Sequence, residues 1–81
     1  MTITIYTITD ENTGRECTNC TATKKALDRK GITYQSREMT DVEREAFRKA
    51  GHLAAPVVIT DTDTWAGFRP DKILTLTAKE S

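Results

Sequence analysis

The sequence predicts an α/β fold in which three helices cover a mixed four-stranded sheet. Segments rich in β-branched residues alternate along the chain with segments whose apolar residues have helical spacing. Gly, Asn, Asp and Pro residues separate these segments, as expected for turns and loops. The chain has 81 residues, so we expect one domain spanning residues 1–81.

The first half of the chain should form a strand, a loop, a helix and a second strand. Thr alternates with Ile or Tyr at 2–9, which predicts the first strand. The polar segment 10–16 predicts a loop, and a helix is expected over 18–30, where Gly31 ends it. The second strand is expected over 32–36. The apolar positions of the helix are Ala22, Ala26 and Leu27.

A second helix should begin at the capping box formed by Thr40 and Glu43. In this motif the two side chains bond reciprocally to backbone N–H groups that the first helical turn leaves free. The helix should run to about Ala50, because Gly51 follows as a stop signal. Its expected buried face consists of Val42, Ala46, Phe47 and Ala50.

Two strands and a helix complete the predicted order βαβαββα. The strands are expected at 57–59 and 64–66, with a turn at 61–63, and Pro70 suits the first position of a last helix. The first two strands are joined through a helix and should be parallel, whereas the short turn makes the last two antiparallel. The apolar side of the last helix should be Ile73, Leu74 and Leu76.

The composition argues against several function classes. Twelve basic and twelve acidic side chains give zero net charge, which favours neither nucleic acid nor an anionic membrane as partner. No apolar run is long enough to span a bilayer, and the N-terminus has no secretory signal. We therefore expect a cytoplasmic protein, in a reducing compartment where structural disulfides are unusual.

Cys17 and Cys20 form a Cys-x-x-Cys motif between the first strand and the first helix. Cysteines three apart on the first turn of a helix can come within disulfide reach. Free N–H groups and the helix dipole stabilise a thiolate there, and thiol pKa values in such motifs fall from about 8.5 towards 7 or below. We expect a redox-active disulfide in which Cys17 is the nucleophile and Cys20 resolves the mixed disulfide.

Other uses of the two cysteines are less well supported by the sequence. A structural zinc site needs four ligands, whereas the chain has two Cys and one His. A zinc or iron–sulfur centre would have to be shared between two chains. Two inert buried cysteines would not need this spacing at a strand-to-helix junction. We expect no bound metal or cofactor.

Four segments resemble the NrdH-redoxins, small glutaredoxin-like proteins that behave functionally like thioredoxins. The resemblance covers most of the chain. It implies a thioredoxin-like fold and a dithiol electron donor to class Ib ribonucleotide reductase, recharged by thioredoxin reductase and NADPH. It is compatible with an actinobacterial or phage source, and we expect a monomer. The segments are Cys17–Asp28, Gly31-Ile32, Ala55-Pro56-Val57-Val58 and, most specifically, Trp65-Ala66-Gly67-Phe68-Arg69-Pro70-Asp71.

The resemblance also implies which residues contact a substrate. It places a cis-proline loop beside the cysteines, so we expect Pro56 to be cis and to lie against the pair. Trp65 is expected to be a partly exposed docking residue, although it could be a plain strand residue. Phe68 belongs to the same segment, although packing against a helix is its simpler role. The substrate-binding candidates are Thr18, Asn19, Ala55, Pro56, Trp65 and Phe68.

Two charged segments bear on the cysteines and on the reductant. The loop 10–16 is longer than is usual in the family; within it Glu16 should oppose a thiolate at Cys17, and Arg15 should favour it. Arg69 lies near the place where glutathione-using glutaredoxins carry an acidic residue for the glutathione amino group. A cation there should repel that group, whereas Asp71 is explained as a first-turn acid. The basic residues expected to form a solvated helix face are Lys24, Lys25, Arg29 and Lys30.

The sequence therefore favours a protein-disulfide reductant that thioredoxin reductase recharges more efficiently than glutathione does. Three alternatives stay open. One is a reductase of mixed disulfides with glutathione or mycothiol. Another is a metal or iron–sulfur binding module that uses both cysteines, and the last is an interaction subunit in which the cysteines are vestigial.

Overall fold

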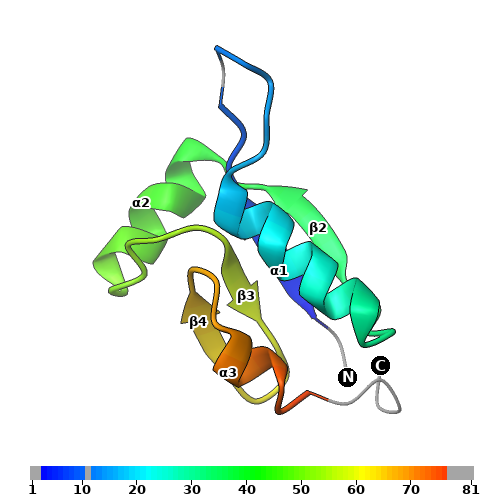
Figure 1. The fold of residues 1–81 in the computed structure, drawn as a ribbon. Helices are drawn as coiled ribbons and strands as arrows, with labels where there is room; N and C mark the ends of the chain where they lie inside the picture. Colours follow the sequence, from blue (N-terminus) through cyan, green and yellow to red (C-terminus); the bar gives the residue numbers. More distant parts are fainter. Residues whose placement is uncertain (1–2, 11, 77–81) are drawn as a thin grey trace.

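The computed structural model describes residues 3–10 and 12–76. The predicted order βαβαββα is confirmed (Figure 1). The sheet has the strand order β2-β1-β3-β4, in which β1 pairs parallel with β2 and antiparallel with β3, and β3 pairs antiparallel with β4. The elements are β1 (Thr4–Thr7), α1 (Thr18–Arg29), β2 (Gln35–Glu38), α2 (Asp41–Lys49), β3 (Val57–Ile59), β4 (Thr64–Ala66) and α3 (Pro70–Ile73).

The helices cover both faces of the sheet. Helices α1 and α3 contact each other on the face turned toward the viewer in Figure 1. Ile5 of β1 belongs to the core on this side, together with Leu27 of α1. Successive strand residues point to opposite faces, so Tyr6 lies on the other side, where its ring meets Phe47 of α2 at a centroid distance of 5.2 Å. The remaining buried core residues are Ile3, Ile32, Val58, Trp65, Ile73 and Leu76.

The second strand begins three residues later than predicted, at Gln35. Ile32 is buried, as a strand residue would be, but it closes the C-terminus of α1 instead. Its N–H donates to the carbonyl of Leu27, and Gly31 has a φ of 70°. This is the bonding and conformation of a helix C-cap, in which an apolar residue follows a left-handed glycine. The apolar pattern around Ile32 therefore reports a cap and not a strand.

Helix α2 has no buried residue, so the predicted burial of Val42, Ala46 and Ala50 is wrong. Val42 is 80% exposed, and only Phe47 is half-buried among the four. The helix meets the sheet along one narrow side, so its other small apolar residues remain in solvent. The predicted capping box is confirmed: Glu43 N–H donates to the Thr40 hydroxyl at 3.1 Å, and Thr40 N–H donates to the Glu43 carboxylate at 3.0 Å.

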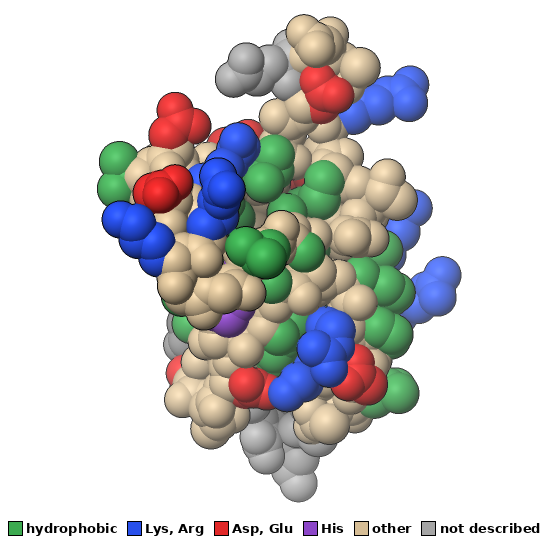
Figure 2. Space-filling model, turned by 90° about the vertical axis from the view of Figure 1, so that its left-hand side faces the viewer, with side chains coloured by type: hydrophobic (Ala, Val, Ile, Leu, Met, Phe, Trp, Pro, Cys, Tyr) green, Lys and Arg blue, Asp and Glu red, His purple; other side chains and the backbone are tan. Residues whose placement is uncertain are grey.

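Helix α3 is a single turn. Ile73 and Leu76 are buried as predicted, whereas Leu74 is exposed and its expected packing is wrong. The helix ends at Ile73, so Leu74 lies beyond it and faces solvent. Across the described residues, no helix is both long and apolar enough to cross a membrane. Figure 2 shows basic and acidic side chains intermingled on one face of the molecule.

Candidate active site

Cys17 and Cys20 form a disulfide at the N-terminus of α1, with their Cα atoms 5.2 Å apart. Cys17 is the N-cap residue, and its sulfur accepts a hydrogen bond from the Cys20 N–H at 3.1 Å. Cys17 is half-buried, whereas Cys20 is 0% exposed. A partner can therefore reach only the first sulfur.

Cys17 is held by the sheet as well as by the helix. Its N–H donates to the carbonyl of Ile8, just beyond the end of β1, at 2.9 Å. Its own carbonyl accepts from the N–H of Thr21 at 3.1 Å. The bond from the Cys20 N–H and the positive end of the helix dipole favour negative charge on the Cys17 sulfur.

The Ala55–Pro56 peptide bond is cis, as predicted. Pro56 is buried, and its carbonyl accepts from the N–H of Gly67 at 2.8 Å, which ties the loop to the end of β4. Val57 pairs with Tyr6 in the sheet. This register places the proline loop at the edge of the sheet where β1 ends and the chain turns toward Cys17.

The described part of the loop 10–16, which is residue 10 and residues 12–16, forms a hairpin that projects beyond the N-terminal end of α1 (Figure 1). Thr9 and Glu16 form an antiparallel bridge at its base. Within it, Asp10 N–H donates to the Arg15 carbonyl, and Gly14 N–H donates to the Asp10 carbonyl, both at 2.8 Å. Gly14 has a φ of 71°, which suits glycine at the turn.

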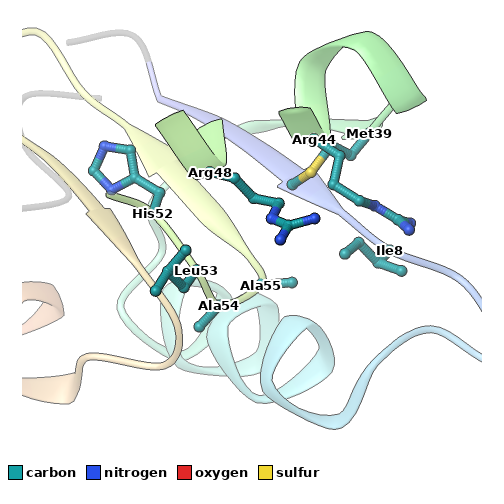
Figure 3. A pocket seen from close by; sticks show the side chains of 8 residues that line it. All are labelled: Ile8, Met39, Arg44, Arg48, His52, Leu53, Ala54 and Ala55. Carbon is teal, nitrogen blue, oxygen red and sulfur yellow. The ribbon is translucent and has the colours of Figure 1, made fainter. Parts of the chain in front are cut away.

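Two cavities lie near the end of β1, and Ile8 lines both. The first, the hairpin cavity, has a volume of about 470 Å³ and is lined by Cys17. The second, the proline cavity, has a volume of about 190 Å³, is lined by Ala54 and Ala55, and has neither cysteine in its lining. The hairpin cavity is lined by Ile8, Asp10, Thr13, Arg15, Glu16, Cys17 and Thr18. The proline cavity is lined by Ile8, Met39, Arg44, Arg48, His52, Leu53, Ala54 and Ala55 (Figure 3).

Arg44 and Arg48 of the proline cavity were not singled out by the sequence. Figure 3 shows both side chains extending toward Ile8. Neither forms an ion pair within the part of the chain that the structure describes. Asp41, Glu45 and Lys49 of the same helix line a different depression. The i and i+4 spacing of Arg44 and Arg48, which places them on one face of the helix, is the signal that could have identified them.

Glu16 is bound to α1 on the far side of the hairpin base. Its carboxylate forms an ion pair with Lys24 and accepts a hydrogen bond from the Thr21 hydroxyl at 3.3 Å. The expectation that Lys24 belongs to a freely solvated helix face is therefore wrong. Lys30 is not freely solvated either, because its ammonium group donates to the carbonyl of Leu74. The charge expected to oppose a thiolate at Cys17 is paired, whereas Arg15 is exposed.

Trp65 is 4% exposed and belongs to the hydrophobic core, so the expectation of a partly exposed docking residue is wrong. It pairs with Val58 in the sheet, and both side chains face the core. Phe68 lies just beyond β4 and is 37% exposed. Thr18 and Asn19 are exposed on the first turn of α1. These three residues stay available to a partner.

Arg69 is not a free cation. Its Nε and Nη2 donate to the two carboxylate oxygens of Asp71 at 3.1 and 2.9 Å. These bonds hold the pKa of Asp71 below its ordinary value and raise that of Arg69. Asp71 is thus a partner of Arg69 as well as a first-turn acid. The assumption that Arg69 is an unpaired cation is therefore wrong, because Asp71 balances its charge.

The fold and the cysteine pair define a thiol–disulfide oxidoreductase of the thioredoxin and glutaredoxin class. A family model described as Glutaredoxin matches residues 3–65. The chain belongs to the glutaredoxin family and is an NrdH-like redox protein. Among residues 3–10 and 12–76, no group of three or more His, Cys, Asp or Glu could hold a metal ion.

Relatives and solved structures support this assignment. Glutaredoxin-like protein NrdH of Escherichia coli K12 is 42% identical over 78 residues, covering 90% of this chain and 85% of the relative. The Salmonella typhimurium protein of the same name is 36% identical with the same coverage. The structure of NrdH-redoxin from E. coli matches with a TM-score of 0.79 and 38% identity, covering 94% of this chain and 95% of that one. A glutaredoxin from Archaeoglobus fulgidus, at 18% identity and a TM-score of 0.63, shares the fold and covers 91% and 83% of the two chains.

Proposed function

We propose that the protein is a cytoplasmic electron donor to a protein disulfide, that of class Ib ribonucleotide reductase, and that thioredoxin reductase recharges it with electrons from NADPH. The observation that carries the proposal is the asymmetry of the cysteine pair, with Cys17 accessible at the helix N-cap and Cys20 buried behind it. The E. coli relative supports it, because that NrdH-redoxin is a glutaredoxin-like protein with a thioredoxin-like activity profile.

The reaction transfers two electrons in two exchange steps. In the reduced protein the thiolate of Cys17 attacks one sulfur of the partner disulfide, forming a mixed disulfide and releasing the other partner sulfur as a thiolate. Cys20 then loses its proton and attacks the Cys17 sulfur. This step forms the Cys17–Cys20 disulfide, and the second partner sulfur leaves as a thiolate. The partner is reduced, and this protein is oxidised.

The surroundings of Cys17 fit an extended substrate segment. We assign its contacts to the first turn of α1, to the proline loop and to Phe68. The exposed residues Thr18 and Asn19 follow the nucleophile in the chain, and Ala55 lines the proline cavity. The assigned contacts are Thr18, Asn19, Ala55, Pro56 and Phe68.

A glutathione-dependent mixed-disulfide reductase is the second candidate. The cations Arg44 and Arg48 in the proline cavity favour it, because guanidinium groups bind carboxylates strongly and glutathione carries two. The pairing of Arg69 with Asp71 also removes the charge that was expected to repel glutathione.

Coupled NADPH oxidation distinguishes the two candidates. The oxidised protein is assayed with thioredoxin reductase, and separately with glutathione and glutathione reductase, at matched concentrations. A protein disulfide is the final acceptor, and class Ib ribonucleotide reductase is tested as one such acceptor. We expect the thioredoxin-reductase rate to be the higher. A glutathione rate equal to it or above it would overturn the proposal in favour of the second candidate.

A further inference from the structure

The negative charge of Glu16 should disfavour the thiolate form of Cys17. Glu16 directly precedes Cys17, and the two residues line the same cavity. A carboxylate beside a thiol disfavours the thiolate and raises the thiol pKa. Because only the thiolate attacks a disulfide, an uncompensated Glu16 would slow the exchange reaction at neutral pH.

The structure shows where this negative charge is compensated. The Glu16 carboxylate is bound by the Lys24 ammonium, on the second turn of α1, and by the Thr21 hydroxyl on the first. The Glu16 and Lys24 side chains are only 25% and 24% exposed. Partial burial limits solvent screening, so this pair has a stronger electrostatic effect than a fully exposed one.

The other charged groups that the structure describes near Cys17 do not bond to the Glu16 carboxylate. Asp10 and Arg15 are on the hairpin, and both line the Cys17 cavity. Lys25 shares a neighbouring depression with Glu16 but makes no bond to it. Beyond Ile8, the proline cavity contributes cations and His52, and the N-terminus of α3 contributes an internally neutral pair. These last groups are Arg44, Arg48, His52, Arg69 and Asp71.

We propose that Lys24 is a positioning residue for the redox reaction, which holds the Glu16 carboxylate against α1 and neutralises it so that Cys17 remains a thiolate at neutral pH. The inference rests on the proposed role of Cys17 as nucleophile. The same ion pair between Glu16 and Lys24 also holds the base of the hairpin against α1. The structure of the hairpin and the reactivity of Cys17 therefore depend on one contact.

The test is a pH titration of the reduced full-length protein. The rate of Cys17 alkylation by iodoacetamide is measured against pH, and peptide mapping identifies the modified cysteine. Lys24→Met should raise the midpoint by about 0.5–1 pH unit, which lowers the alkylation rate about three- to tenfold well below the midpoint. The matched control Lys25→Met removes the same charge one residue away, and its midpoint should stay within about 0.3 unit of wild type.

Two further variants separate charge from structure. Glu16→Gln should lower the midpoint, because it leaves the Lys24 cation unopposed near the thiolate. The double variant Glu16→Gln with Lys24→Met should return to the wild-type midpoint, since both charges are gone. Glu16→Gln keeps the test valid even where Lys24→Met does not fold.

Several outcomes would contradict the proposal. Equal shifts in Lys24→Met and Lys25→Met would show a general effect of lost positive charge. A slower alkylation rate at every pH with no change of midpoint in Lys24→Met would show that Lys24 has only a structural role. An unchanged midpoint in Glu16→Gln would show that the Glu16 carboxylate does not influence the Cys17 thiolate. The titration needs no partner protein. It can therefore fail while the proposed function stands, whereas alkylation of Cys20 in place of Cys17 would overturn the proposed function itself.

Discussion

The two sides of the cysteine pair are built in different ways. The proline side is fixed by buried backbone, because Pro56 is buried and its carbonyl is bonded to Gly67. The hairpin side is held by a backbone bridge between Thr9 and Glu16 and by the partly buried ion pair of Glu16 with Lys24. The proline side is therefore part of the packed fold, whereas the hairpin lies outside the four-stranded sheet. We expect reactivity and partner choice to be adjusted on the hairpin side.

The largest expected effect lies between the two sides, at the cysteines themselves. Cys17→Ser should reduce the protein-disulfide reductase rate to the uncatalysed background, because the accessible sulfur is lost. Cys20→Ser should also lose turnover but retain a single attack on the substrate. The NADPH-coupled assay with thioredoxin reductase measures both. Substantial turnover by Cys17→Ser would show that the roles of the two cysteines have been assigned incorrectly.

On the proline side, replacing Arg48 with Ala should lower the glutathione-coupled rate about tenfold. The change removes one charge-assisted hydrogen bond to a carboxylate, worth about 1.5 kcal/mol. The matched control is Lys49→Ala, since Lys49 lies on the same helix but lines a different depression. If both variants lose activity equally, the cavity has no special role and only the total charge of α2 matters.

On the hairpin side, residues 10–15 can be replaced by Asn-Gly. Thr9 and Glu16 are bridge partners, and a two-residue turn of this sequence is suited to connect such a pair. We expect the rate with a bulky folded protein disulfide to rise by up to about fivefold, equivalent to about 1 kcal/mol, because one wall of the Cys17 cavity is removed. The rate with a small disulfide should stay the same. A parallel change in both rates would mean that the hairpin acts on the cysteine and not on access to it.

The smallest effect is expected at the N-terminus of α3. Hydrogen bonds from Arg69 lower the pKa of Asp71, and one from Lys72 lowers the pKa of Asp63. A lowered folded-state pKa gives stability that is present above the ordinary value of 3.8 and is lost as the pH falls through the folded value. Thermal unfolding between pH 5 and about pH 3 should therefore show a small loss of stability. Asp71→Asn should reduce that loss, and an unchanged slope would mean that the pair contributes nothing measurable.

Local signals in the sequence predicted local structure well. The capping box of Thr40 and Glu43 and the start of α1 at the Cys-x-x-Cys motif depend on residues within one helical turn, and both are found as predicted. The resemblance predicted the cis bond at Pro56, which composition could not have assigned.

Features that depend on distant neighbours were predicted poorly. The burial of Trp65 depends on which face of β4 meets the core, and the exposure of Val42 depends on how α2 lies on the sheet. Lys24 is eight residues from Glu16, and the two meet because the base of the hairpin lies beside the first two turns of α1. No periodicity along the chain encodes that contact.

Covalent trapping identifies which cysteine attacks the substrate disulfide. Cys20→Ser is mixed with a disulfide-bearing protein substrate, and the product is analysed by mass spectrometry with peptide mapping. We expect a stable mixed disulfide through Cys17, because the resolving thiol is missing. We expect no adduct with Cys17→Ser, whose remaining sulfur is buried. Equal trapping by both variants, or an adduct through Cys20 alone, would contradict the assignment of the accessible N-terminal sulfur as the nucleophile.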